Sequence, residues 1–311
     1  MLNKVCRWLG GWIGYLLFAL ALLLLFLWLL FPKEALPRLL VQYLNGAYPQ
    51  LNWQIQSMTL RMPEGLRLGG IEGCEAQDKK KPWVRVDLLE LRPDIPGMWQ
   101  AKRLRVGYRL LLAQGVIAGT LQLDGWKTGV RFDGTVQGVQ LTELPMLARL
   151  LERKLQGTVA ATFKGMLPPT TGKNGGMEAT LKIDNGLLAL KRPILTHRSL
   201  LFSQATVMLR SHGESLQLEQ GVVESELFSG QFAGDVTLHR EPAVSRINVA
   251  GTLQPRPDFF KGVSSGAVLQ LIRTQLKGNT LPFRLTGALY DPGIGFEEYS
   301  MLFQTLEKEL Q

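Results

Sequence analysis

Cysteine and histidine are scarce in this sequence of 311 residues, which contains two cysteines and three histidines. Two cysteines cannot build the disulfide framework of a small secreted domain or a cysteine-rich metal site. The histidines, His197, His212 and His239, do not have the spacing of zinc ligands, and we interpret them as surface residues. These absences predict a domain that is stabilised by packing alone.

A convincing catalytic motif is also lacking. Residues 262–266, GVSSG, match the G-x-S-x-G pattern of a hydrolase nucleophile elbow. That elbow needs a preceding strand and a later histidine, whereas residues 255–260 are a poor strand and no histidine follows Ser264. No glycine-rich phosphate-binding loop is present. We therefore expect a protein that is not an enzyme and that uses no cofactor or metal.

One long stretch, residues 8–31 (WLGGWIGYLLFALALLLLFLWLLF), has no charged residue. As a helix it would be about 36 Å long, enough to cross a hydrocarbon core of roughly 30 Å. Lys4 and Arg7 precede it, which predicts a cytoplasmic N-terminus and places the rest of the chain outside the cytoplasm. The predicted membrane-anchor residues at its two ends are Trp8, Trp12, Tyr15, Trp28 and Phe31.

The alternative is a cleaved signal peptide, but the only A-x-A sequence, Ala19 to Ala21, lies inside the apolar run. We therefore prefer an uncleaved signal anchor. Gly10 and Gly14 form a G-x-x-x-G pair, a candidate helix–helix contact, although the pattern is weak and a helix that merely tolerates glycine is the better explanation. In this topology Cys6 and Cys74 lie on opposite sides of the membrane and cannot pair.

The predicted domain organisation follows from this anchor. It comprises a cytoplasmic tail (1–7), the transmembrane anchor (8–31), an amphipathic linker helix (32–48) and an outer β domain (49–311). The net charge of +9 is spread along the chain, which indicates a solvated surface or a preference for anionic lipid headgroups. Nucleic acid is not expected as a partner of a domain outside the cytoplasm.

Period-2 alternation of apolar and polar residues dominates after residue 50 and predicts strand after strand. We expect turns at Pro63-Glu64-Gly65 and Asp133-Gly134, and a hairpin at Asn185-Gly186. Helices are expected at residues 141–156, 264–276 and 297–310. The predicted fold is mainly β: a long twisted antiparallel sheet, either a curved half-barrel or a sandwich, with a few short covering helices.

The alternation gives the predicted sheet one apolar face. Its residues could line an open groove or simply form the core of a closed sandwich. The candidate groove residues are Met177, Leu181, Ile183, Leu281, Phe283 and Leu285.

Several phrases resemble a known family. The anchor, the stretch KEALPRLLVQYL, the phrase MPEGLRLGGI and the later GQFAGDVTL, SRINVAGTLQP and LPFRLTGALYDP together look like the N component of bacterial type II secretion systems, the GspN family. The similarity runs along nearly the whole chain and rests on diffuse patterning. It implies a single-pass inner-membrane protein with a periplasmic β domain, an accessory part of the secretion machine. The strand-and-glycine pattern also resembles AsmA-like envelope proteins, whose curved sheets are connected with lipid movement.

Two functions are therefore expected from the sequence. The first is a structural or assembly component that works with the inner membrane and other type II secretion components. The second is a lipid-handling protein that binds phospholipid on the apolar face of its sheet.

Overall fold

The structure is a computed structural model that describes residues 35–61, 64–75, 82–97, 103–123, 129–147, 153–167, 175–194, 197–213, 215–239, 244–260, 280–289 and 291–296. The predicted transmembrane anchor (8–31), with its aromatic residues and the Gly10–Gly14 pair, lies outside these residues, as do the helices predicted at 264–276 and 297–310. Among the described helices, none has the length and apolar character needed to cross a membrane.

The chain divides into two compact units, Met1–Pro49 and Gln50–Gln311. In the first unit, helix α2 spans Ala35–Ala47. Pro37 lies in the first turn, where backbone N–H groups have no partner within the helix. The N–H group that proline lacks therefore costs the helix no hydrogen bond. Leu40 and Leu44 are half-buried, whereas Leu39 and Tyr43 are 60% and 76% exposed. The helix therefore presents large apolar side chains to solvent.

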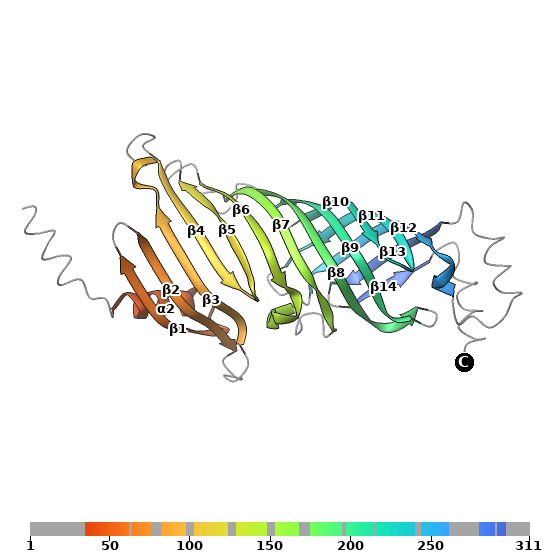
Figure 1. Cartoon of the computed structure of the whole chain (residues 1–311), viewed down its shortest axis with the longest axis horizontal. Coiled ribbons are helices and arrows are strands. Elements are labelled where there is room, and N and C mark those ends of the chain that lie inside the picture. Colours follow the sequence, from red (N-terminus) through yellow and green to blue (C-terminus); the bar gives the residue numbers. More distant parts are fainter. Residues whose placement is uncertain are drawn as a thin grey trace, which may run out of the picture. The chain divides into compact units, whose positions relative to one another are not determined.

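The second unit is built on a single sheet of fourteen strands, whose order in space is their order in the chain (Figure 1). Every neighbouring pair is antiparallel. The strands are β1 Leu51–Arg61, β2 Gly65–Glu75, β3 Pro82–Pro93, β4 Leu104–Leu112, β5 Gly115–Leu123, β6 Val130–Gln140, β7 Leu155–Leu167, β8 Gly176–Ile194, β9 His197–His212, β10 Ser215–Glu224, β11 Phe228–Thr237, β12 Arg246–Pro255, β13 Leu281–Ala288 and β14 Asp291–Gly295.

The mainly β, antiparallel fold predicted from the sequence is confirmed. All described strands belong to one sheet, so they do not form the two sheets of a sandwich. Of the turn predicted at Pro63-Glu64-Gly65, Glu64 is in a turn and Gly65 begins β2, whereas Pro63 lies outside the described residues.

Two predicted turns are wrong. Asp133-Gly134 lies inside β6 and Asn185-Gly186 lies inside the long strand β8. Asn185 does adopt the left-handed conformation (φ 52°) that such dipeptides favour, but the strand continues through it to Ile194. Here glycine makes room for an aromatic side chain of the next strand, because a Cβ on Gly186 would lie 2.6 Å from Cε1 of Phe202.

The helix predicted at residues 141–156 is found in part. A short 3-10 helix, η1, covers Leu141–Glu143, and an α-helical stretch covers residues 145–147. Residues 148–152 lie outside the described part of the chain, and β7 already begins at Leu155. Leu144 is extended (φ −97°, ψ 96°) because it precedes Pro145, whose ring disfavours the helical conformation of the residue before it. The described part of this segment is therefore two short helical pieces separated at Leu144, not one continuous helix.

One buried cluster of hydrophobic residues lies at β6 and β7. Val139, Leu141 and Val159 are buried together. Half-buried hydrophobic residues from neighbouring strands pack against them, including Ile117, Leu181 and Ile183. This cluster includes two of the residues that the sequence places on the apolar face.

Candidate functional site

The apolar face of the sheet is organised in rows of residues that pair from strand to strand. One row, the Tyr108 row, crosses all fourteen strands and contains no charged residue. Its members, from β1 to β14, are Leu60, Leu66, Leu91, Tyr108, Gly119, Gly134, Phe163, Ala179, Leu209, Leu218, Gly234, Val249, Leu285 and Ile294.

A second row on the same face, the Phe283 row, runs from β1 to β13 and consists only of apolar residues and glycine. Its members are Met58, Leu68, Leu89, Leu110, Ile117, Val136, Ala161, Leu181, Val207, Gly221, Phe232, Gly251 and Phe283. Because side chains alternate between faces, two such rows form one continuous apolar surface across the sheet. We call this surface the apolar face.

Glycines in these rows lie beside aromatic rings of neighbouring strands. A Cβ on Gly134 would lie 2.6 Å from Cζ of Phe163, and one on Gly251 would lie 2.7 Å from Cε1 of Phe283. Tyr108 crosses β5 in the same way, and its hydroxyl donates a hydrogen bond to the backbone oxygen of Asp133 at 3.1 Å. The rings therefore cover the glycines, which strengthens a sheet where glycine alone would weaken it.

All six candidate groove residues lie on the apolar face. Leu181 and Phe283 belong to the Phe283 row, and Leu285 belongs to the Tyr108 row. Register connects Ile183 to Leu281 through β9 to β12 in a flanking row, and Met177 lies in another. The register therefore places these six residues on one face.

Only part of the apolar face is fully covered. Thirteen hydrophobic residues among those described are buried, including Val207, Val249 and Leu281. Leu181 and Phe283 are half-buried, and Ile294 at the end of the Tyr108 row is 39% exposed. The core of a closed sandwich with so many apolar positions would bury most of them. The apolar face therefore retains accessible hydrophobic surface.

The apolar character changes sides within β1 to β3. Ile55 and Met58 are three residues apart on β1 and point to opposite faces, yet both are half-buried. On β2, Leu68 and Ile71 are buried on either side of Gly70, whose φ is 62°. The two apolar rows therefore extend over only one end of these three strands.

The opposite face is polar and carries chains of ion pairs. On β7 to β10, Nζ of Lys164 lies 3.1 Å from Glu178, and Arg210 lies 3.6 Å from Glu178 and 2.6 Å from Glu219. The hydrogen bond and charge of Lys164 hold the pKa of the Glu178 carboxyl below its ordinary value. The positive and negative charges of this group are equal in number.

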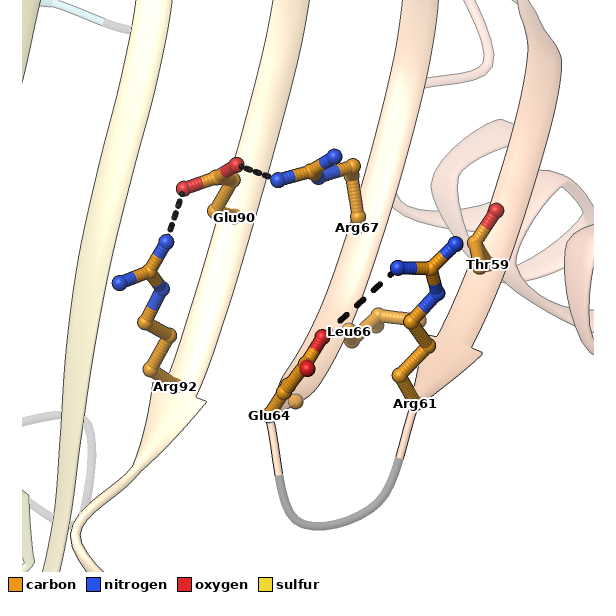
Figure 2. Close-up of a pocket in the computed structure, with 8 residues that line it drawn as sticks. Thr59, Arg61, Glu64, Leu66, Arg67, Glu90 and Arg92 are labelled. Carbon is orange, nitrogen blue, oxygen red and sulfur yellow. Dashed lines mark hydrogen bonds and ion pairs between the residues drawn. The ribbon is translucent and has the colours of Figure 1, made fainter.

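A second polar group lies on β1 to β3 and surrounds a hollow of about 280 Å³ (Figure 2). Nη2 of Arg67 donates to Oε1 of Glu90 at 2.6 Å, and Nη2 of Arg92 donates to Oε2 at 3.0 Å. Burial by itself raises the pKa of the Glu90 carboxyl, but the hydrogen bonds and charges of the two arginines outweigh it and leave the pKa below its ordinary value. Arg61 and Glu64 complete the group at the β1–β2 turn.

The sequence did not single out this arginine group. Arg61 and Arg67 are six residues apart and Arg92 follows 25 residues later, and all three look like ordinary polar positions of alternating strands. Only the pairing of β1, β2 and β3 brings them together. The single available signal was the use of arginine rather than lysine at all three positions.

The structure describes the three histidines but not the serine motif. His197 differs from the prediction, because it is half-buried at the start of β9 and its Nε2 lies 2.9 Å from the carbonyl oxygen of Phe259. His212 and His239 are exposed, as predicted. Ser264 lies outside the described residues, within which no three His, Cys, Asp or Glu side chains gather as metal ligands.

Comparisons with protein-family models, curated proteins and solved structures found no match for this chain.

Proposed function

We propose that this chain is a non-enzymatic component of a bacterial type II secretion system, anchored in the inner membrane with its β domain in the periplasm, and that its role is structural. The resemblance to the GspN family supports this proposal. The C-terminal sequence segments that carry this resemblance, residues 230–238, 245–255 and 281–292, form β11 to β14. They supply Phe232, Gly251 and Phe283, the paired glycine and aromatic residues of the Phe283 row.

The observation that carries the structural role is the unequal protection of the two sheet edges. Strand β14 has five residues, three of which are Pro292, Gly293 and Gly295. Short strands with proline are poor templates for further pairing. Strand β1 has eleven residues, contains no proline or lysine, and among the described strands pairs only with β2. We infer that β1 is the edge on which another secretion component adds a strand.

Gene deletion and crosslinking in the native host test this function. Deletion should remove exoproteins from the culture medium while the outer-membrane barrier stays intact. A photo-crosslinking residue at the exposed Thr59 of β1 should capture another inner-membrane secretion component. The same residue at the exposed Asn248 of the internal strand β12 is the control and should not. Normal secretion in the deletion strain, with no such adduct at Thr59, would reject the proposal.

A second function, lipid binding along the apolar face, is favoured by the two apolar rows. Acyl chains are long and apolar, and a partly covered surface many strands wide can bury them lengthwise. The exposed Leu39 and Tyr43 of α2 fit a protein that works at a membrane surface.

Adjacent residues on β8 provide the matched test, because Leu181 lies on the apolar face and the exposed Thr180 points to the opposite face. Photo-crosslinking residues should be placed at each position in cells, and the purified protein analysed by mass spectrometry. Lipid binding predicts phospholipid adducts at Leu181 and few at Thr180. Equal labelling of the two positions, or none at either, would argue against this function.

A further inference from the structure

The hollow at the β1–β2 turn is created by a glycine between two arginines. Arg61 on β1 pairs with Gly65 on β2. Arg92 on β3 lies beside Gly65 in the same row of the polar face, and it pairs with Gly107 on β4. Gly65 has a φ of 114°, and a Cβ there would lie 3.1 Å from Cα of Arg92 and would overlap the carbonyl of Leu91. No other residue fits this position without a shift of the backbone, so the space between the two guanidinium groups stays open.

The charges around this hollow do not balance. Three arginines face two carboxylates, Glu64 and Glu90. Glu90 has a side chain only 10% exposed and uses one oxygen for each of Arg67 and Arg92. Arg61 has only a loose contact with Glu64, at 4.0 Å, with both side chains more than 70% exposed. The guanidinium of Arg61 and the remaining N–H groups of Arg67 and Arg92 are therefore available to a ligand (Figure 2).

A second hollow of the polar face provides an internal comparison. It has a similar volume, about 310 Å³, and is lined by Lys164, Glu178, Arg210 and Glu219. Its two positive and two negative groups pair with one another at 2.6 to 3.6 Å, so they leave no net charge for a ligand. The hollow at the β1–β2 turn differs in three ways: it has an excess of positive charge, all of its positively charged residues are arginines, and Gly65 places no side chain in it.

We propose that the hollow over Gly65 binds a phosphate-bearing anion, held between Arg61 and Arg92 and contacted by Arg67. Guanidinium groups match phosphate oxygens with paired N–H donors, which a lysine cannot do. Glu90 is a positioning residue, because its two hydrogen bonds fix the side chains of Arg67 and Arg92 beside the hollow. The anion is either free phosphate or the headgroup of a phospholipid. This inference does not depend on the proposed function.

The test uses the full chain in nanodiscs of neutral phosphatidylcholine. Binding of inorganic phosphate and of short-chain phosphatidic acid is measured by calorimetry at constant ionic strength. Both ligands should bind the wild type, and Arg61→Gln/Arg92→Gln should weaken binding at least tenfold. The matched control Lys164→Gln/Arg210→Gln removes the same charge from the balanced hollow and should leave affinity within twofold. Tighter binding of phosphatidic acid than of phosphate would identify a lipid headgroup, and equal binding a free phosphate.

A conservative variant distinguishes binding through the paired N–H donors of arginine from general electrostatic attraction to a positive charge. Arg92→Lys keeps the charge but loses the paired donors, so its affinity should fall several-fold while its melting temperature stays that of the wild type. The inference is overturned if neither ligand binds the wild type, if the two double variants weaken binding equally, or if Arg92→Lys binds as the wild type does.

Discussion

Arg153 and Asp291 form an ion pair across the sheet, with Nη2 and Oδ1 3.0 Å apart. Arg153 precedes β7 and Asp291 begins β14, seven strands further on. At about 4.8 Å per strand, a flat sheet would hold them more than 30 Å apart. Followed strand by strand through the register, Asp291 is in the same row as Met166 on β7. Met166 lies near the end of β7 that is opposite to Arg153, so a flat sheet would separate the pair along the strands as well.

Opposite corners of β7 to β14 therefore meet, which requires the sheet to coil back on itself. Long twisted sheets relieve their twist in this way. The buried residues Val139, Val207 and Val249 all lie on the apolar face, so that face is the inner surface of the coil.

A double-mutant cycle on this pair measures how firmly the corners are joined. Arg153 is 11% exposed and Asp291 53% exposed, so the pair is partly shielded from solvent. We expect Arg153→Gln to lower the free energy of unfolding by about 1 to 3 kcal/mol and the coupling energy to be about 1 kcal/mol. Chemical denaturation of the four proteins measures both. The exposed pair Arg61 and Glu64 serves as control, and we expect its coupling energy to be near zero. If substitutions of Arg153 and Asp291 change the free energy of unfolding additively, their contact does not hold the coil.

Gly134 should resist replacement by even one methyl group. A Cβ there would lie 2.6 Å from Cζ of Phe163 and 3.0 Å from the carbonyl oxygen of Ala118. We expect Gly134→Ala to cost about 1 to 3 kcal/mol and to lower the melting temperature by several degrees. In Gly176→Ala, on β8, the nearest atom to the new Cβ is 3.5 Å away, so its melting temperature should stay close to that of the wild type. Equal effects of the two substitutions would contradict the role given to the aromatic rings.

The same glycine explains where interpretation of the sequence succeeded and failed. Alternation identified the strands because one face of the sheet is buried, and the period of 2 follows from that. It could not distinguish Asp133-Gly134 in a strand from the same dipeptide in a turn, since the local preference is identical. The deciding residue, Phe163, lies on another strand and becomes a neighbour only through the register.

The arginine hollow shows the same limit for sites. Arg67 and Arg92 both reach Glu90, but their separation in the chain follows no motif. The candidate groove residues could be predicted because every second residue shares a face, whereas a polar cluster assembled by three strands has no such period. The coil likewise depends on Arg153 meeting Asp291, a contact between residues 138 positions apart.

Glu90 should make stability depend on pH in the acid range. Its pKa in the folded protein lies below the ordinary value of 4.5, so the ionised form is favoured by folding. This stabilisation is complete above about pH 4.5 and is lost as the pH falls through the folded-state pKa. We expect Glu90→Gln to be less stable than the wild type by about 1 to 3 kcal/mol at pH 7, with the difference shrinking toward pH 3.

Thermal melts of both proteins from pH 7 to pH 3 measure this dependence. Glu64→Gln is the control, because Glu64 is 72% exposed and its replacement should change stability by less than about 0.5 kcal/mol at any of these pH values. A difference between wild type and Glu90→Gln that stays constant with pH would show that the charge of Glu90 is not what matters.

Tyr108 should have the opposite pH dependence, at the alkaline end. Burial raises the pKa of its hydroxyl above the ordinary value of 10.0, and the charge of Asp133 raises it further. Because the folded state favours the neutral hydroxyl, the stabilisation is complete below about pH 10 and is lost as the pH rises through the folded-state pKa. Tyr108→Phe keeps the ring but removes the hydroxyl, which lies over Gly119 and Gly134 and donates to the backbone of Asp133, so it should cost about 0.5 to 1.5 kcal/mol at pH 7. Tyr108→Ala also loses the ring and should cost about 3 kcal/mol or more.

The absorbance of tyrosinate, measured as the difference between wild type and Tyr108→Phe, should rise at a higher pH than that of free tyrosine. If this difference instead titrates at or below pH 10, Tyr108 is not held across the glycines of β5 and β6.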